Sequence, residues 1–246
     1  MRRVIAVQSL NVHHHPTVIS SDGSSQNLIQ AQHELRFENF KEANWDARIV
    51  VRVGERVLEV DEYDGRLTVY LVRLNTRQDQ LLASFRVNPT LFPYLLQHPR
   101  YEEARGFIAD RSDLVERADV AEASRFCIRA DLSADEKARV LADLRIARAE
   151  FMRRFGITQF LAMTRRVRWQ TQFESHGWSI ETLGCEIEFG DGSRAQAYRH
   201  WITDQAFEEQ RSLSGISEPI LDADTVYWPD ARFALRQSEG TQVSAT

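Results

Sequence analysis

Residues 133–164 carry the sequence SADEKARVLADLRIARAEFMRRFGITQFLAMT, which predicts a long helix followed by a buried strand. Ser133 and Glu136 form a capping box at the start of the helix, and Gly156 suits the left-handed position after its end. Between them, apolar residues recur at helical spacing, which predicts one face packed on a core. The fold prediction starts from this helix and strand.

The sequence on both sides of this unit alternates between strand and helix patterns. Upstream we expect a helix over 26–43, strands over 4–7, part of 46–61, 67–74, 81–87 and 124–129, and short helical pieces over 91–98 and 101–108. Downstream we expect a helix over 165–175 and a hairpin of 179–189 and 195–202 around Gly190-Asp191-Gly192. This order predicts an α/β (α+β) fold, a three-layer α/β/α sandwich around one mixed, mostly antiparallel sheet.

The composition is that of a globular protein. The chain has 246 residues, of which 43% are hydrophobic and 27% charged, and its formal net charge of -5 argues against general nucleic-acid binding. No apolar run approaches the ~18–20 residues of a membrane span, and no secretory signal is recognisable. The two cysteines form no CxxC pair and the three adjacent histidines have no ligand partner at suitable spacing, so we expect no disulfide and no metal site. These observations leave a cytoplasmic enzyme or a cytoplasmic binding protein as the expected class of protein.

Acidic residues and arginines gather in the first half of the chain. Glu59 and Asp61 are two apart, so on an extended segment they face the same side, and Asp64 enters the following turn. Glu122 and Arg125 flank the start of a predicted strand. Each has a structural alternative, because an aspartate before glycine is commonly a turn former and a surface ion pair contributes little.

Taken together, these residues resemble the acyl-homoserine-lactone synthases, the LuxI-type autoinducer synthases. The matching blocks are Arg36 with Phe40 and Trp45, the sequence EVDEYD at 59–64, Arg86 at the end of a central strand, and EASRF at 122–126. Their order is that of the family and their spacing is close. The segment between Trp45 and Glu59 is longer than in the family, as are the N-terminal segment and the tail after Ile202.

The resemblance implies a fold similar to the GNAT acyltransferases. It also implies transfer of an acyl group from acyl-carrier protein or acyl-CoA to the amine of S-adenosylmethionine (SAM), followed by lactonisation. The products are N-acyl-L-homoserine lactone, used in quorum sensing, and methylthioadenosine, so SAM is a substrate and no cofactor is expected. We expect one domain at residues 1–206, with a mobile helical lid at about 20–48, and a partly disordered extension at 207–246.

The chemistry of SAM fits these residue types, since carboxylates suit its ammonium, rings its sulfonium and an arginine its carboxylate. The expected catalytic residues are Glu122, Asp61, Asp64 and Arg125. Glu122 is the first choice for the base that takes a proton from the amine, with Asp61 next. The expected SAM-binding residues are Arg36, Phe40, Trp45, Glu59 and Arg86.

Two further sites are expected around the long helix. The acyl chain needs an apolar pocket, for which the candidates are Ser124, Phe126, Phe160, Met163, Thr164 and Trp169, although each can instead be ordinary core. The stretch 139–168 holds eight arginines against two acids. It is either a solvated helix face or a dock for an acidic carrier protein through Arg148, Arg153, Arg154, Arg165 and Arg166.

Two other functions remain open. The first is a GNAT-like N-acyltransferase acting on a different amine, but that enzyme needs no sulfonium pocket and usually has a glycine-rich pyrophosphate loop, which this sequence lacks. The second is a catalytically silent binding protein on the same scaffold. Every family position that can be placed here holds a competent residue, which favours the synthase.

Overall fold

The computed structural model describes residues 3–8, 24–41, 49–64, 67–75, 77, 80–91, 96, 111, 113–114, 117–164, 173–188, 194–224, 226 and 228. In chain order the elements are β1 (Val4–Gln8), α1 (Ser24–Phe40), β2 (Ile49–Val53), β3 (Arg56–Val60), β4 (Val69–Leu74), β5 (Leu81–Pro89), β6 (Val120–Ile128), α3 (Ala134–Phe155), β7 (Gln159–Thr164), β8 (Trp178–Glu188), β9 (Arg194–Ile202), α5 (Asp204–Leu213) and β10 (Leu221–Asp222). The pieces expected at 91–98, 101–108 and 165–175 lie mostly outside the described residues.

One mixed sheet runs through the molecule. Its eight strands lie in the order β10-β1-β4-β5-β6-β7-β9-β8. Neighbouring strands are antiparallel except for β1 with β10 and β6 with β7. The mixed, mostly antiparallel sheet expected from the sequence is therefore confirmed.

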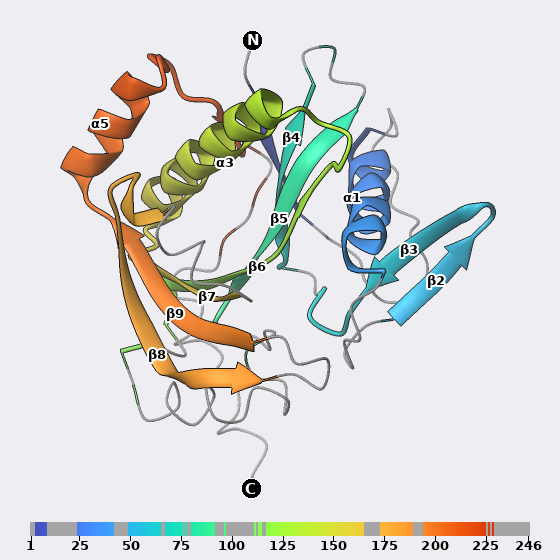
Figure 1. The fold of residues 1–246 in the computed structure, drawn as a ribbon, viewed down its shortest axis with the longest axis horizontal. Helices are drawn as coiled ribbons and strands as arrows, with labels where there is room; N and C mark the ends of the chain where they lie inside the picture. Colours follow the sequence, from blue (N-terminus) through green and yellow to red (C-terminus); the bar gives the residue numbers. More distant parts are fainter. Residues whose placement is uncertain are drawn as a thin grey trace, which may run out of the picture.

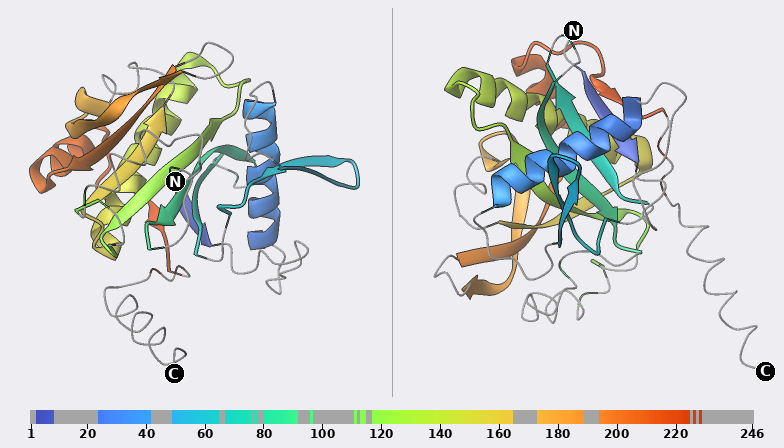
Figure 2. Two further views of the ribbon diagram at one scale, coloured as in Figure 1. Left: turned by 90° about the horizontal axis from the view of Figure 1, so that it is seen from below. Right: turned by 90° about the vertical axis from the view of Figure 1, so that its right-hand side faces the viewer.

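Helices cover both faces of this sheet (Figures 1 and 2). On one face, α1 packs Leu28, Ile29 and Leu35 against a cluster that includes Tyr70 and Val72 of β4. On the other face, α3 packs on the main core, and α5 lies against α3. This is the three-layer arrangement predicted, and it divides the protein into an α1 face and an α3 face.

The ends of α3 follow the local sequence signals. The Ser133 hydroxyl accepts a hydrogen bond from the backbone N–H of Glu136, and the Glu136 carboxylate accepts one from the backbone N–H of Ser133. Gly156 follows the helix at φ 66°, a left-handed conformation that costs glycine nothing. Both predicted caps are confirmed.

The strands β6 and β7 diverge in the middle of the sheet. They pair in parallel only from Val120 with Gln159 to Glu122 with Leu161, although β6 continues to Ile128 and β7 to Thr164. Beyond Glu122 and Leu161, no described residue of β6 pairs with a residue of β7. The sheet therefore forks at Glu122.

Two parts of the chain differ from the expected outline. The segment after Trp45 contains the β2–β3 hairpin, a separate two-stranded sheet that projects beyond α1 (Figure 1). At the other end, Phe207, Ile216 and Trp228 are buried in the main core and β10 pairs with β1. These described residues beyond the expected boundary at 206 therefore pack on the same core and sheet as the rest of the described chain. None of the helices in the described part of the chain is long and apolar enough to span a membrane.

Candidate functional site

The carboxylates of Asp61 and Asp64 are held inside the turn that follows β3. The backbone N–H of Asp61 donates to Oδ2 of Asp64 at 2.8 Å, and the N–H of Tyr63 donates to Oδ1 of Asp61 at 3.0 Å. The N–H of Asp64 donates to the carbonyl of Asp61 at 3.1 Å. Aspartate favours such turns because its short side chain reaches nearby backbone N–H groups. The same bonds fix the direction of both carboxylates.

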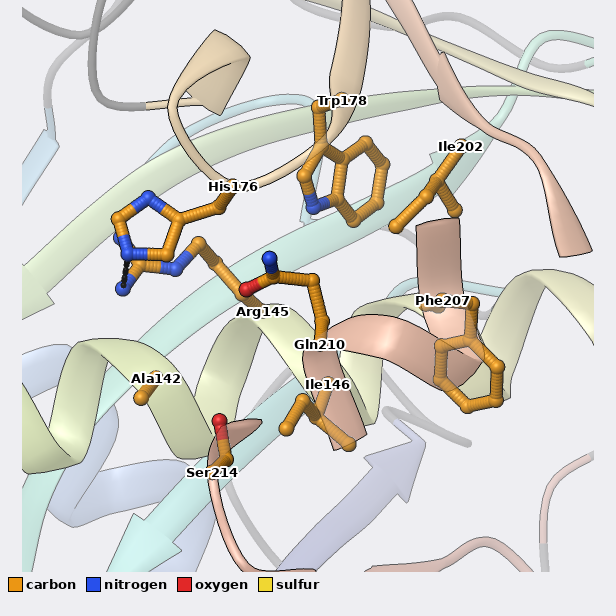
Figure 3. Close-up of a pocket in the computed structure, with 10 residues that line it drawn as sticks. Ala142, Arg145, Ile146, His176, Trp178, Ile202, Phe207, Gln210 and Ser214 are labelled. Atoms are coloured by element: carbon orange, nitrogen blue, oxygen red, sulfur yellow. Dashed lines mark hydrogen bonds between the residues drawn. The ribbon is translucent and has the colours of Figure 1, made fainter. Parts of the chain in front are cut away.

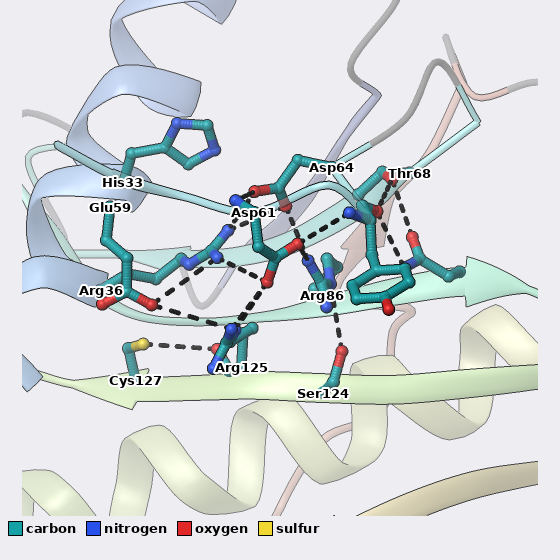
Figure 4. Close-up of polar contacts among 12 residues, drawn as sticks. His33, Arg36, Glu59, Asp61, Asp64, Thr68, Arg86, Ser124, Arg125 and Cys127 are labelled. Atoms are coloured by element: carbon teal, nitrogen blue, oxygen red, sulfur yellow. Dashed lines mark hydrogen bonds and ion pairs between the residues drawn. The ribbon is translucent and has the colours of Figure 1, made fainter. Parts of the chain in front are cut away.

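Three arginines from separate elements converge on these carboxylates (Figure 4). Arg36 of α1 donates to both oxygens of Asp64 at 2.8 Å and to Asp61 at 3.1 Å. Arg86 of β5 donates to Asp61 at 2.5 Å and to Asp64 at 2.9 Å. Arg125 of β6 donates from Nε and Nη2 to Oδ2 of Asp61 at 2.9 and 2.8 Å. The network joins α1 to the sheet.

Two glutamates complete this group. Oε1 of Glu59 lies 3.8 Å from Nη2 of Arg36 and 4.0 Å from Nε of Arg125. Oε1 of Glu122 lies 4.0 Å from Nη2 of Arg86, and its Oε2 accepts a hydrogen bond from the backbone N–H of Leu96 at 2.8 Å. We call the full set the acid–arginine cluster: Arg36, Glu59, Asp61, Asp64, Arg86, Glu122 and Arg125.

The acid–arginine cluster is buried and carries a surplus negative charge. None of its members is more than 5% exposed. Counted in their ordinary ionised forms, four carboxylates and three guanidinium groups give the cluster a formal excess of one negative charge. Burial by itself raises the pKa of Asp61 and of Asp64, but the neighbouring arginines outweigh it and hold both pKa values below their usual range. Both aspartates are therefore ionised and poor proton acceptors.

Arg125 reaches the cluster through a β-bulge. Ser84 pairs with Cys127 and Arg86 pairs with Ser124, so β6 contains one residue more than β5 between these pairs. Arg125 stands in this bulge with φ 52°, a left-handed conformation that is rare for a non-glycine residue. The bulge changes the alternation of side chains along β6, which lets Arg125 and Ser124 both point to the α1 face.

Two residues of this network, Tyr70 and His33, were not among those predicted from the sequence. The Tyr70 hydroxyl donates to Oδ1 of Asp64 at 2.7 Å and lies 3.2 Å from Nε2 of His33. Burial lowers the pKa of His33 to about 4, so its imidazole is neutral. Two sequence features could have indicated them. His33 precedes Arg36 by three positions, so the two residues share one face of the helix, and Tyr70 belongs to the strand that pairs with the strand of Arg86.

The expected SAM-binding residues are brought together as far as they are described. Arg36, Glu59 and Arg86 belong to the acid–arginine cluster, and the Phe40 ring lies with its centroid 5.7 Å from Cζ of Arg125. Trp45 lies outside the described residues.

The expected acyl-pocket residues do not line one pocket, because they lie on opposite faces of the sheet. Phe160 and Phe126 pack on the main core of the α3 face. Met163 packs with Leu161 in a second apolar cluster on the α1 face, where Ser124 accepts a hydrogen bond from Nε of Arg86 at 3.1 Å. Thr164, at the end of β7, alternates with Met163 and shares the face of Phe160. Trp169 lies outside the described residues.

The expected carrier-docking arginines are largely occupied within the chain. Arg148 is buried, with its guanidinium 4.4 Å from the Phe160 ring centroid and in contact with Nε2 of His200, so it is not part of a docking surface. Arg153 pairs with Asp204 and Glu208 of α5. Arg154 pairs with Asp224 at 2.9 Å. Arg165 and Arg166 lie outside the described residues.

A family model for autoinducer synthases matches residues 21–199. The solved structure of BjaI, a CoA-dependent acyl-homoserine lactone synthase with SAM and isopentyl-CoA, is similar with a TM-score of 0.70 and 20% identity, over 97% of this chain and 100% of that chain. MesI, also a CoA-dependent acyl-homoserine lactone synthase, gives 0.65 and 22% over 90% and 100%. The acyl-homoserine lactone synthase LasI gives 0.63 and 20% over 89% and 98%. These likenesses concern the fold, and no curated protein matches the sequence.

Proposed function

Because this chain belongs to the autoinducer synthase family, we propose that it makes an N-acyl-L-homoserine lactone from SAM and an acyl thioester. The observation that carries the proposal is the acid–arginine cluster beside the fork of β6 and β7. Membership of the family makes the chain an acyltransferase. Both substrates are cytoplasmic metabolites, and we propose that the enzyme works in the cytoplasm.

The surplus negative charge of the cluster suits the positive charge of SAM. The sulfonium and the protonated amine are cations, and a buried site with one excess carboxylate is stabilised when a cation enters. The Phe40 ring, with Trp45, supplies an aromatic face for the sulfonium. The cluster is buried beneath α1, so SAM entry requires movement on that face, which supports a lid within residues 20–48. Such a movement must break the bonds of Arg36.

Glu122 is the better candidate for the base in the first step. The SAM amine attacks the thioester carbonyl, the new N–C bond forms, and the C–S bond breaks to release the thiol after the amine has lost a proton. Asp61 binds three arginines and its pKa is lowered, so it is a weak acceptor for that proton. Glu122 stands at the fork, where Nη2 of Arg86 lies 4.0 Å from its Oε1 and the backbone N–H of Leu96 donates to its Oε2. We assign it the proton transfer, directly or through water.

The second step needs orientation more than acid–base chemistry. The SAM carboxylate attacks its own γ-carbon, a C–O bond forms, and the C–S bond breaks to release methylthioadenosine. This leaving group departs neutral, so no general acid is required. The site contributes by holding the chain folded so that carboxylate and carbon approach each other.

We propose that the acyl chain binds on the α1 face, beside the cluster. The second apolar cluster contains Leu96, Leu161 and Leu183, with Met163 packed against it. Leu96 is also the residue whose N–H binds Glu122, which connects this apolar cluster to the proposed base. Phe160 and Phe126 face α3 and are left as core residues.

For the donor we propose acyl-CoA ahead of acyl-carrier protein. Arg153 and Arg154 already pair with acids of this chain, which reduces the positive charge available for an acidic protein. The measurement is kcat/KM with acyl-CoA and with acyl-carrier protein of the same chain length. A higher kcat/KM with the carrier protein contradicts this preference.

The activity is tested by incubating the protein with SAM and a panel of acyl-CoA thioesters and measuring products by mass spectrometry. We expect lactone and methylthioadenosine in equal amounts. Glu122→Gln should abolish both, whereas Glu62→Gln, the same change at an exposed position of the same acidic block, should leave turnover near normal. Thiol release without methylthioadenosine refutes the synthase and favours an N-acyltransferase acting on another amine.

A further inference from the structure

Tyr70 belongs to a row of three polar side chains that crosses the middle of the sheet on the α1 face. It is directly opposite Arg86 of β5, and Arg86 is directly opposite Ser124 of β6. Residues opposite each other on neighbouring antiparallel strands have their side chains on the same face. Tyr70 therefore stands beside the guanidinium that binds both aspartates of the acid–arginine cluster.

The guanidinium of Arg86 is fixed by two of its nitrogens, and the third is directed at the proposed base. Nε donates to Oγ of Ser124 at 3.1 Å, and Nη1 donates to Asp61 and Asp64 (Figure 4). Because a guanidinium is planar, these bonds also fix the direction of Nη2. Among the described residues Nη2 has no hydrogen-bond partner, and it lies 4.0 Å from Oε1 of Glu122. The orientation of Arg86 thus determines how a positive charge faces Glu122 at the fork.

The Tyr70 hydroxyl connects Asp64 to the sheet. Oδ1 of Asp64 accepts from Arg36 at 2.8 Å, from Arg86 at 2.9 Å and from Tyr70 at 2.7 Å. Arg36 belongs to α1, whereas Tyr70 belongs to β4 of the sheet. Without the hydroxyl, the only sheet donor printed for Oδ1 is Arg86, the residue that Asp64 itself orients. Tyr70 therefore gives Asp64 a fixed point that does not depend on α1 or on Arg86.

His33 of α1 fixes the direction of this hydroxyl. A tyrosine hydroxyl has one hydrogen, which rotates to suit its partners. Asp64 is ionised and can only accept, so the hydrogen is directed at Asp64, and Nε2 of His33, 3.2 Å from the Tyr70 oxygen, is the donor to that oxygen. The two rings meet edge to face, with centroids 5.7 Å apart and planes at 81°, and both side chains are buried.

We propose that His33 and Tyr70 are positioning residues of the acyl transfer. His33 directs the Tyr70 hydroxyl to Asp64, and Asp64 holds Arg86 so that its Nη2 faces Glu122. Both act through Asp64 and not on the substrates. This inference rests on the proposed function and extends it to the residues that arrange the proposed base.

The experiment measures kcat and the KM for SAM of the full-length protein with one acyl-CoA. Tyr70→Phe removes only the hydroxyl, and we expect kcat to fall by about tenfold while the KM for SAM changes by less than about twofold, because misplacing the base slows the chemistry without removing a SAM contact. His33→Leu should lower kcat by about threefold. His33→Gln should keep kcat near the wild-type value, since the glutamine amide can donate from the position of Nε2.

Two matched controls come from the opposite face of the sheet. Tyr198→Phe removes the hydroxyl of another buried tyrosine, whose ring packs against His200. His176→Leu removes another hydrogen-bonded histidine, which lies beside Arg145 at the small hollow between α3 and α5 (Figure 3). Both variants should keep kcat near the wild-type value.

The double variant with His33→Leu and Tyr70→Phe tests whether the two residues act in series. If His33 acts through the Tyr70 hydroxyl, the double variant is no slower than Tyr70→Phe alone, whereas losses that multiply overturn the proposal. An unchanged kcat in Tyr70→Phe, or a raised KM with an unchanged kcat, also overturns it. If Tyr70→Phe does not fold, equal kcat values for His33→Leu and His33→Gln decide against it. A wild type that forms no lactone refutes the proposed function itself, and this inference with it.

Discussion

Asp64 should be needed for folding, and Asp64→Asn tests this. Four donors make five hydrogen bonds to this carboxylate: Oδ2 accepts from Nη1 of Arg36 and the N–H of Asp61, and Oδ1 accepts from the same Nη1 of Arg36, from Arg86 and from the Tyr70 hydroxyl. Asparagine replaces one of these oxygens by an NH₂ group, which cannot accept. At least one bond from a charged donor and one from a neutral donor are then lost, whichever oxygen is replaced.

The loss can be estimated from these bonds. A hydrogen bond to a charged group contributes about 1.5–3 kcal/mol and a neutral one about 0.5–1.5 kcal/mol, so we expect a decrease in unfolding free energy of about 3 kcal/mol. Breaking one partner of a buried ion pair gives a similar value of about 3–5 kcal/mol. For a domain of this size, 3 kcal/mol corresponds to a decrease in Tm of about 6–12 °C.

The assay is urea unfolding followed by tryptophan fluorescence and by far-UV circular dichroism. The matched control is Asp113→Asn, since Asp113 accepts from Nε and Nη2 of Arg111 at 2.8 and 2.9 Å but its side chain is 45% exposed. The control should change the unfolding free energy by less than about 1 kcal/mol, as surface ion pairs do. If Asp64→Asn loses no more than the control, the network does not stabilise the fold and our reasoning is wrong.

Three other predictions concern pH, thiol reactivity and capping. Burial lowers the pKa of His33 to about 4 from an ordinary value of 6.5, so between these pH values the unfolded chain binds more protons than the folded protein. The unfolding free energy should therefore fall as the pH drops from 6.5 to 4. Urea unfolding at several pH values should show a smaller pH dependence for His33→Gln than for the wild type. Burial raises the pKa of Cys127 to about 12, so iodoacetamide should label the exposed Cys185 in the native protein and Cys127 only after unfolding; native labelling of both contradicts the packing of β6. Ser133→Ala should lower the unfolding free energy by about 1 kcal/mol, because the capping box is lost, and an unchanged urea midpoint would show that the cap contributes nothing.

Local signals were sufficient for many elements of the fold, although α5 and β10 were not predicted from the sequence. The caps of α3, the strand patterns of β4 and β5 and the pairing of β8 with β9 each follow from neighbours in the sequence, and each prediction agrees with the structure. The residues of the acid–arginine cluster were also identified in advance, because their types and order follow a family pattern. The ion pairs among those residues were not predicted, because the pairing of Arg36 with Asp64 depends on where α1 packs against the sheet.

The sequence by itself determined which charged groups this protein has and which strands and helices carry them. Only the tertiary structure decided how they pair. The bulge at Arg125 changes the face of one side chain, which a regular alternation cannot predict, and it directs a third guanidinium to Asp61. Likewise the opposite faces of Phe160 and Met163 separate two candidates for one pocket, and burial makes Arg148 a core residue. The sequence specifies which charged side chains are present. Their ion-pair partners and their exposure to water depend on contacts between segments that are far apart in the sequence.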